Sequence, residues 1–377
     1  MTACAYISPR KFPAIVSDII VSTGKHEDSI RPTTLDAGEP FRRHARKNYI
    51  IDGKIGLAFS GDVENIGLAL KDIVAQKENI IASKRPMRVV GDIIESFDGI
   101  RAVGASTENN SRYSNNFFKH SEAQFNFHSN ALGNTVVAGS GGVYLKNKLI
   151  SISSKPQLQY KDWRSKVSLD ILNRVYGVEI LRPLKEGQTE FIFSYFYALN
   201  IFTFLFQTIN ISSLVAEING LHRLGYGGFY EYIYWSLPRN RWMRQEPMVY
   251  MLYELVREPD RMFITQVPVA YLYNPGYLRG ELWVWRQGLW SFNTLDDIQC
   301  GLEEEGTILS IQDPKWRPSV AHIGFVRKKN GQFFLEGSVS TLAGEINEIT
   351  FTREGNQFSI GMSEEWLDYA GRTFLPL

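Results

Sequence analysis

The chain has 377 residues, of which 44% are hydrophobic and 21% charged, and its formal net charge at pH 7 is +1. This balance is that of a soluble globular protein, and the length fits two domains. The near-zero charge gives no electrostatic basis for binding nucleic acid or an anionic membrane. Two cysteines, Cys4 and Cys300, are too few for a disulfide framework and lack metal-ligand spacing. We therefore expect a reducing, cytoplasmic location.

The first part of the chain predicts strands and helices in one α+β domain. The strands that its pattern predicts are residues 3–8, 13–22, 47–51, 54–60 and 134–138. Asp52-Gly53 is a typical hairpin turn between two of these strands. Asp62 is the expected N-cap of a helix with apolar residues at helical spacing, and Pro86 lies near the start of a second helix over 86–98. Residues 25–46 and 105–122 are polar and predict loops.

The most apolar segment of the chain, residues 191–206, has the sequence FIFSYFYALNIFTFLF. It is shorter than the ~20 residues that span a bilayer, and it contains Ser194, Asn200 and Thr203. We therefore expect a buried helix or strand and no membrane partner. A second helical pattern covers residues 205–221, and a strand follows at 229–235.

Beyond about residue 258 the pattern becomes β-rich. Strands are predicted at 264–273 and 282–292, and the hairpin turns lie at Lys329-Asn330-Gly331 and Glu354-Gly355-Asn356. We therefore expect two domains, residues 1–257 and a β-rich C-terminal domain at 258–377.

Thr2 directly follows the initiator methionine. A small second residue permits removal of Met1, which leaves a hydroxyl and a free α-amine on one residue. This pairs a nucleophile with its own base, a known way of activating threonine. An α-amino pKa of about 7.7–8.0 suits a general base near neutral pH.

Five further features follow Thr2 in a fixed order. They are Val16-Ser17-Asp18, Lys47 ahead of an apolar strand, Phe59-Ser60-Gly61-Asp62, Ala138-Gly139-Ser140-Gly141-Gly142 and Gly227-Gly228-Phe229. In this order the first ~235 residues resemble the proteasome β-subunit family of N-terminal-nucleophile (Ntn) hydrolases. The resemblance implies a four-layer αββα Ntn-hydrolase sandwich with the β-rich C-terminal domain appended. It also implies an insertion at about residues 145–190, which are mostly polar and predict irregular structure after about residue 150.

The resemblance implies a chemical role for five residues. Thr2 supplies Oγ as the nucleophile, and its freed amine takes the proton. Lys47 stabilises the developing negative charge, and Asp18 is its buried partner. Gly61 offers its backbone N–H to the oxyanion, and Ser140 orients the amine. No metal or other cofactor is implied.

The same resemblance to the proteasome β-subunit family implies which residues bind the substrate. Val21, Ala45, Phe59 and Val63 line the first pocket, and the backbone of Ser22 pairs with the substrate. Because the four pocket side chains are apolar, we expect a small or apolar substrate side chain there.

One departure from the family and one condition of the mechanism bear on activity. The family has an aspartate and a serine shortly before the later Gly-Gly, and residues 223–226 (Arg223-Leu224-Gly225-Tyr226) supply neither. The mechanism also cannot run while Met1 remains attached.

Some identities stay open in the sequence. Arg46 and Lys54 lie close to Lys47 and are alternative cations, and Cys4 is a rival nucleophile. The histidines show no metal-ligand spacing and are interpreted as structural: they are His26, His44, His120, His128, His222 and His322.

The sequence therefore predicts a threonine peptidase acting on peptide or protein substrates. The resemblance further implies a homo-oligomeric ring and an ATPase or other regulatory partner. Two alternatives remain open: a small-molecule amidase of the same fold, and a catalytically inactive fold that serves as a scaffold or sensor.

Overall fold

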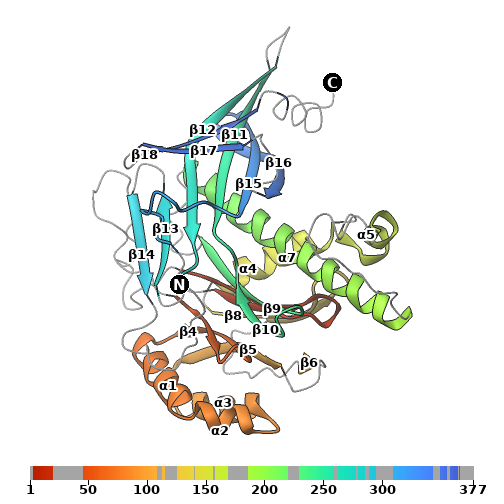
Figure 1. Cartoon of the computed structure of the whole chain (residues 1–377), viewed down its shortest axis with the longest axis vertical. Coiled ribbons are helices and arrows are strands. Elements are labelled where there is room, and N and C mark those ends of the chain that lie inside the picture. Colours follow the sequence, from red (N-terminus) through yellow and green to blue (C-terminus); the bar gives the residue numbers. More distant parts are fainter. Residues whose placement is uncertain are drawn as a thin grey trace.

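The computed structural model describes residues 3–19, 46–107, 113–114, 125–139, 141–155, 158–168, 186–219, 229–257, 262–276, 279–284, 288–293, 309–342, 349–354, 357–363 and 365. Over these residues the chain is an α+β protein with two six-stranded sheets, a four-stranded sheet and a separate hairpin (Figure 1).

The first six-stranded sheet, called the central sheet here, runs in the order β10-β9-β2-β1-β8-β7. Its strands are β1 (Cys4–Ser8), β2 (Ala14–Asp18), β7 (Phe125–Ser129), β8 (Gly133–Ala138), β9 (Tyr230–Ser236) and β10 (Arg241–Arg244). All neighbouring strands in it are antiparallel. Every residue of β1 and β2 is buried, which is expected of strands that are covered on both faces.

One face of the central sheet packs on the four-stranded sheet, whose order is β3-β4-β5-β6. Its strands are β3 (Asn48–Ile51), β4 (Ile55–Gly61), β5 (Ile100–Thr107) and β6 (Tyr113–Ser114). The predicted hairpin between β3 and β4 is confirmed: Ile51 pairs with Ile55, Asp52 and Gly53 in the turn have positive φ of 52° and 62°, and the Lys54 N–H donates to the Ile51 carbonyl at 3.0 Å. Along β4 the side chains alternate, so Ala58 joins the core beneath the central sheet and Phe59 joins a separate core under the helices.

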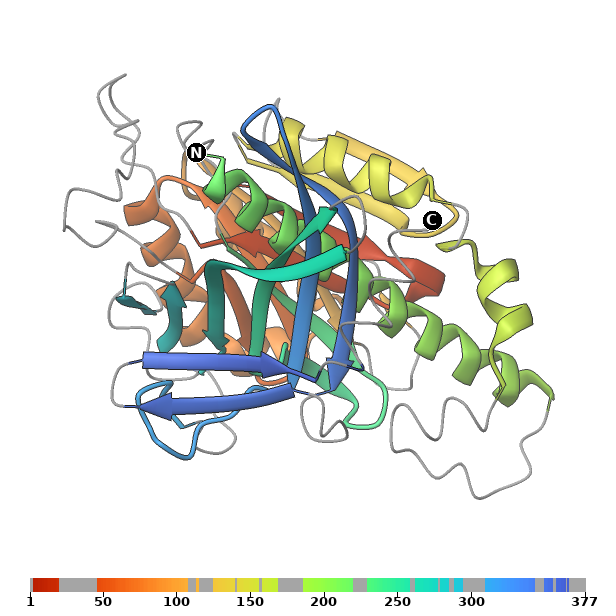
Figure 2. The ribbon, with the colours of Figure 1, turned by 90° about the horizontal axis from the view of Figure 1, so that it is seen from above.

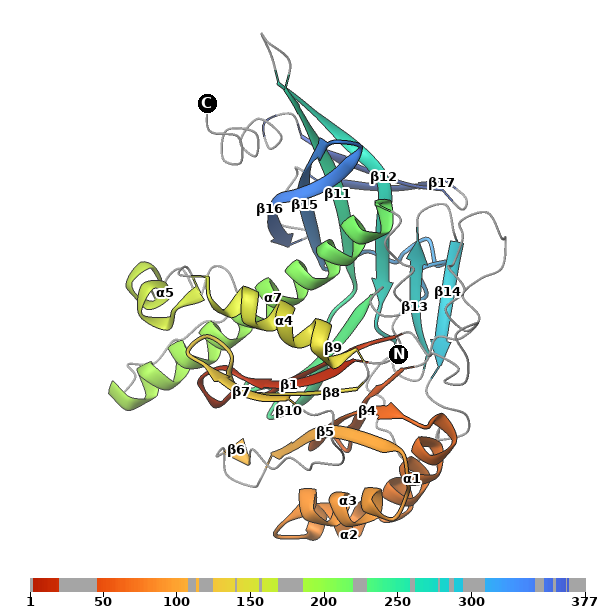
Figure 3. The same ribbon diagram turned by 180° about the vertical axis from the view of Figure 1, so that it is seen from behind.

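Three short helices cover the outer face of the four-stranded sheet: α1 (Val63–Ala75), α2 (Lys77–Ala82) and α3 (Pro86–Glu95). As predicted, Asp62 caps α1, and its side chain accepts a hydrogen bond from the Asn65 N–H at 2.9 Å. On the other side of the molecule, α4 (Gly142–Ser153) and the long helix α7 (Glu186–Ile218) lie against the central sheet. Figure 3 shows this order of helices, two sheets and helices.

The segment from residue 145 to 190 is more regular than the sequence predicts. Residues 145–153 belong to α4, which packs on β1 and β8, and α5 (Tyr160–Lys166) follows. Helix α7 begins at Glu186 rather than near residue 205. The helical period is hidden here because α7 is apolar around its whole circumference, as expected of a helix covered on several sides. Residues 169–185 lie outside the described residues.

The second six-stranded sheet, called the C-terminal sheet here, runs in the order β14-β13-β12-β11-β15-β16. Its strands are β11 (Met248–Arg257), β12 (Met262–Asn274), β13 (Arg279–Val284), β14 (Gly288–Asn293), β15 (Val320–Lys329) and β16 (Gln332–Leu342). Strands β11 and β15 are parallel, and the other neighbouring pairs are antiparallel. The predicted turn at Asn330-Gly331 is present between β15 and β16, and β17 (Ile349–Glu354) pairs with β18 (Gln357–Met362) across the other predicted turn.

Two observations revise the picture of a first domain at 1–257 and an appended second one. Strand β11 pairs within the C-terminal sheet, so the passage from one sheet to the other falls at residues 245–247. Helix α7 also serves both parts: Phe202 belongs to the core of the central sheet, and Leu214 belongs to a core with the C-terminal sheet. Seen from above, C-terminal strands cross over α7 (Figure 2).

Residues 191–206 form part of α7, as the prediction of a buried helix or strand allows. Among the described helices, only α7 is long and apolar enough to cross a membrane by length and composition, over Gln188–Ile218. Of its most apolar window, 61% is buried inside the structure.

Candidate active site

A buried ion pair lies between β2 and the residue that precedes β3. Lys47 Nζ is 2.6 Å from Asp18 Oδ1, and the exposed fractions of the two side chains are 8% and 0%. The strand pattern brings these residues together although 28 residues separate them in the sequence. The structure thus contains the pair that the sequence predicts, and the catalytic roles remain a proposal.

The backbone around Ala3 and Lys47 fixes this pair. Asp18 N–H donates to the Ala3 carbonyl at 3.1 Å, and Ala3 N–H donates to Asp18 Oδ1, also at 3.1 Å. The Lys47 carbonyl accepts from the Phe59 N–H at 3.1 Å. The pair is therefore tied to the residue that directly follows Thr2.

Burial and charge act in opposite directions on Asp18. Burial raises the pKa of its carboxyl above the usual value, while the Lys47 ammonium and the Ala3 N–H lower it in part. A lysine placed at 2.6 Å is the group that compensates a carboxylate in this position.

The three cations that the sequence leaves open occupy different environments. Lys54 is about half exposed and lies 3.3 Å from Asp52 in the β3–β4 hairpin. Arg46 is wholly buried and pairs with Glu231 of β9 at 2.9 Å. Lys47 alone of the three is paired with Asp18 among the described contacts.

Cys4 is a poor nucleophile in this structure. Its side chain is fully buried in β1, and burial raises the pKa of the thiol to about 12. Because the thiolate is the reactive form, almost none is present near neutral pH.

Gly61 ends β4 in a conformation that favours glycine. Its φ is +121°, and a Cβ at this position would lie 2.0 Å from the carbonyl oxygen of Gly99. The sequence marks Gly61 as an oxyanion donor, and the structure adds a steric reason for a glycine here.

The other predicted site residues divide into two groups. Phe59 is 1% exposed and packs edge to face on Tyr49, while Val63 is 41% exposed at the start of α1. The remaining predicted site residues lie outside the described residues: they are Thr2, Val21, Ser22, Ala45 and Ser140. Residues 223–226, where the supporting aspartate and serine of the family are missing, lie outside them too.

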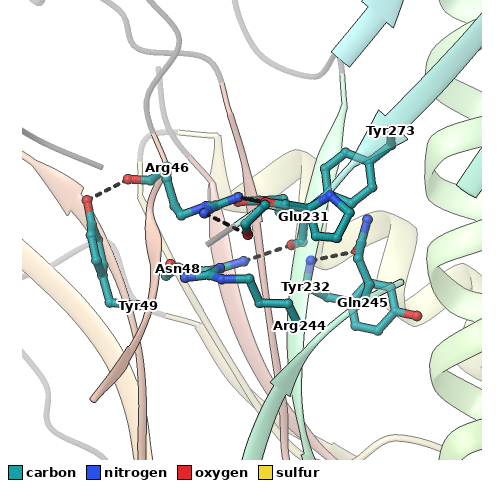
Figure 4. A network of polar contacts seen from close by, with 10 residues as sticks. Arg46, Asn48, Tyr49, Glu231, Tyr232, Arg244, Gln245 and Tyr273 are labelled. Atoms are coloured by element: carbon teal, nitrogen blue, oxygen red, sulfur yellow. Dashed lines mark hydrogen bonds and ion pairs between the residues drawn. The ribbon is translucent and has the colours of Figure 1, made fainter. Parts of the chain in front are cut away.

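Next to Lys47 lies a buried polar network that the sequence analysis missed (Figure 4). Glu231 Oε1 accepts from Arg46 Nη2 at 2.9 Å and from the Tyr273 hydroxyl at 2.5 Å. Arg244, from β10, donates to the Asn48 carbonyl at 3.0 Å. One signal was available, since Glu231 is a lone carboxylate in the otherwise apolar and aromatic strand YEYIYWS.

No protein-family model and no curated protein matches this chain. Among solved structures it is similar to eukaryotic HslV from Trypanosoma brucei, with a TM-score of 0.26 and 14% identity over 43% of this chain and 88% of that chain. It is also similar to a Gly-1 mutant of Anbu from Hyphomicrobium sp. strain MC1, with a TM-score of 0.33 and 12% identity over 65% of this chain and 87% of that chain. TM-scores of this size do not establish a shared fold.

Proposed function

We propose that this chain is a threonine-type Ntn peptidase in which Thr2, exposed by removal of Met1, attacks a peptide carbonyl. The observation that carries the proposal is the buried Lys47–Asp18 pair and its hydrogen bond to the Ala3 backbone. Consecutive Cα atoms are about 3.8 Å apart, so Thr2 is covalently held next to the residue that contacts this pair.

The arrangement of layers supports the same proposal. Helices α4 and α7, the central sheet, the four-stranded sheet and helices α1–α3 follow one another. An αββα sandwich of the Ntn-hydrolase type, which we propose for this chain, has the same order of layers, and β1 and β2 lie in the middle of one sheet.

In the first step the Thr2 amine takes the proton from Thr2 Oγ, and Oγ bonds to the carbonyl carbon of the substrate. The Lys47 cation lowers the energy of the negative charge that develops on the oxygen atoms and favours the unprotonated form of the amine. Asp18 holds the lysine in place and balances its charge.

The oxyanion of the tetrahedral intermediate accepts the Gly61 N–H, where loss of one donor costs about 3–4 kcal/mol of transition-state stabilisation. The intermediate collapses as the C–N bond breaks and the leaving amine takes the proton from the Thr2 ammonium. An ester on Thr2 remains. Water then attacks this ester and gives a proton to the Thr2 amine. The bond between the acyl carbon and Thr2 Oγ breaks as the ammonium returns this proton to Oγ, which releases the acid product and restores the free amine.

The substrate side of the proposal rests on apolar side chains. Phe59 packs on Tyr49 in the core under the helices, and Val63 leaves part of its surface to solvent at the start of α1. With Val21 and Ala45 these residues make a pocket for a small or apolar side chain, and the backbone of Ser22 pairs with the substrate. Ser140 orients the Thr2 amine. The motif resemblance also leads us to propose a cytoplasmic homo-oligomer, ring-shaped and served by an ATPase or other regulatory partner.

Intact mass followed by a matched pair of assays tests this function. The purified chain is expected to have lost the mass of Met1, and to hydrolyse peptide amides that carry an apolar residue before the cleaved bond. Thr2→Ala is expected to lose this activity while retaining the thermal unfolding midpoint of the wild type.

Three outcomes would redirect the proposal. Full retention of Met1, or equal turnover by both proteins, would rule out Thr2 as the nucleophile. Turnover of small amides without turnover of peptides would favour the amidase alternative. If both proteins are inert but folded, the scaffold alternative is favoured.

A further inference from the structure

The buried network beside Lys47 connects the candidate active site to the C-terminal sheet. It centres on Glu231, which is 1% exposed and lies in β9. This carboxylate faces the Arg46 guanidinium on one side and the Tyr273 hydroxyl on the other (Figure 4).

Glu231 accepts hydrogen bonds from both residues that adjoin Lys47 in the chain. Arg46, which precedes it, binds the Glu231 carboxylate through Nη2 at 2.9 Å and Nε at 3.4 Å. Asn48, which follows it, donates from Nδ2 to the Glu231 backbone carbonyl at 2.9 Å. The side chains on each side of Lys47 are thus hydrogen-bonded to one residue of β9.

Glu231 also stands beside the strand that carries Asp18. In the β2–β9 pairing, Glu231 lies opposite Ser17, and Tyr230 lies opposite Asp18. The same short stretch of β9 therefore contacts the strand that carries Asp18 and the residues on both sides of Lys47.

The outer part of this network comes from the C-terminal sheet. Tyr273 lies near the end of β12, and Arg46 donates to the carbonyls of Pro275 and Gly276 just beyond that strand. Burial raises the pKa of the Tyr273 hydroxyl well above its usual value, and the Glu231 charge raises it further, so Tyr273 remains a donor at every physiological pH.

We propose that Glu231 and Tyr273 are positioning residues of the proposed reaction, and that the end of β12 sets the position of Lys47 through Arg46. The inference rests on the proposed function. It assigns the C-terminal sheet a part in building the active site, in addition to covering α7.

The physical basis is the cost of leaving a buried charge without its partners. Arg46 and Glu231 are removed from water, so each is stable only with its hydrogen bonds made. If the Tyr273 hydroxyl and the carbonyls of Pro275 and Gly276 move away, the Arg46 guanidinium must move as well. Lys47 then moves with the adjoining backbone. A displacement of about 1 Å at a reacting group can cost a hundredfold in rate.

Tyr273→Phe tests this with the loss of one oxygen atom. We expect kcat for peptide hydrolysis to fall roughly tenfold to a hundredfold, because the lost hydroxyl lets Arg46 and the adjoining Lys47 shift from their positions. The matched control is Tyr271→Phe. Tyr271 lies on the same strand, is equally buried, and also donates to a carboxylate, that of Glu217 on α7.

The control separates positioning from general loss of stability. Both variants lose a buried tyrosine–glutamate hydrogen bond, so both lower the unfolding midpoint, but only Tyr273→Phe is expected to lower kcat. An equal fall of kcat in both variants, or no fall in Tyr273→Phe, would overturn the inference.

A double-mutant cycle on stability gives a result that does not depend on activity. The ion pair is replaced by the neutral pair Asp18→Asn with Lys47→Met, and this background is combined with Tyr273→Phe. Substitutions at independent sites have additive effects, whereas substitutions within one network do not. Because the inference couples Tyr273 to the Lys47–Asp18 pair, we expect the combined shift in the denaturation midpoint to differ from the sum of the separate shifts. The same cycle with Tyr271→Phe is expected to be additive.

The two readouts separate the two proposals. If the wild type shows no peptidase activity but the Tyr273 cycle is non-additive, the positioning network stands and the proposed function fails. If the wild type is active but the Tyr273 cycle is additive, the network inference fails and the function stands.

Discussion

Lys47 and Lys54 lie close together in the sequence but face carboxylates in opposite environments. The Lys47–Asp18 pair is buried, whereas the Lys54–Asp52 pair lies at the surface of a hairpin. We expect Lys47→Met to lower peptide hydrolysis by at least about a hundredfold, because it removes the cation that we propose stabilises the negative charge of the reaction. Lys54→Met is expected to stay within about twofold of the wild type, since surface pairs contribute little. Similar rates for both variants would remove Lys47 from the proposed mechanism.

Gly61 is expected to tolerate no side chain. Gly61→Ala places a Cβ 2.0 Å from the Gly99 carbonyl oxygen at a φ of +121°, and should lower the free energy of unfolding by about 3 kcal/mol or more. Gly331→Ala is the control: its φ is +79°, but nothing lies within 4 Å of the added atom. It carries the backbone strain alone, about 1–2 kcal/mol. Equal losses in chemical denaturation would show that the contact with Gly99 relaxes.

The buried thiol of Cys4 predicts a pH dependence. Folding raises the pKa of Cys4 from 9.0 to about 12, so its contribution to stability is fully present below about pH 9 and is lost as pH rises toward 12. At pH 8 the thiolate is roughly a thousandfold rarer in the folded chain than in the unfolded one. We expect a thiol reagent to modify Cys4 at a correspondingly low rate until denaturant is added, as measured by peptide mass mapping. Rapid modification of Cys4 in the folded protein, together with loss of peptidase activity, would support Cys4 as the nucleophile instead.

At the scale of single elements, the start of α1 depends on one carboxylate. Asp62 accepts the Asn65 N–H, so Asp62→Ala should lower the free energy of unfolding by about 1 kcal/mol. The control is Asp72→Ala on the same helix, where the side chain is exposed and does not cap the N-terminus. An equal loss of unfolding free energy in the Asp72 variant would mean that the charge on the helix, and not the N-terminal cap, causes the destabilisation.

Elements defined by local chemistry are those that the sequence predicts well. Asp52-Gly53 and Asn330-Gly331 adopt positive φ because these residue types tolerate it, and Asp62 caps because its oxygen reaches a free N–H of the first turn. The Asp18–Lys47 contact could be predicted only through the resemblance, since neither residue signals the other locally.

Elements defined by distant partners are those that the sequence obscures. Helix α7 shows no clear period because different faces of it are covered by different sheets. The predicted domain boundary at residue 257 leaves β11 in the first domain, because nothing local reveals its parallel partner β15, which is distant in the sequence. The Glu231 network is of the same kind, since its members come from β9, β10, β12 and the residues around Lys47.

At the scale of the whole molecule, the two six-stranded sheets share α7 and are expected to unfold together. Gly324 of β15 lies against this helix, and a Cβ there would meet Ile211 at 2.6 Å and Leu252 at 2.7 Å. Gly324→Ala should therefore lower the free energy of unfolding by about 1–3 kcal/mol and the temperature of a single calorimetric transition by about 1–4 °C. Gly67→Ala on α1, which has open space around it, should raise the same transition slightly. Two separate transitions, with only one of them moved, would show that the sheets unfold independently.

The position of α7 in the chain has a consequence for biosynthesis. The strands that cover it in both cores include β9, β11, β12, β15 and β16, all made after the helix itself. At about 5–20 residues per second, residues 219–342 take about 6–25 s to emerge. During that interval the ribosome presents a 31-residue apolar helix, long enough to cross a bilayer, with most of its native cover still unsynthesised. We therefore expect nascent chains of this protein to be most prone to aggregation during the interval that begins as α7 emerges and ends when β16 pairs.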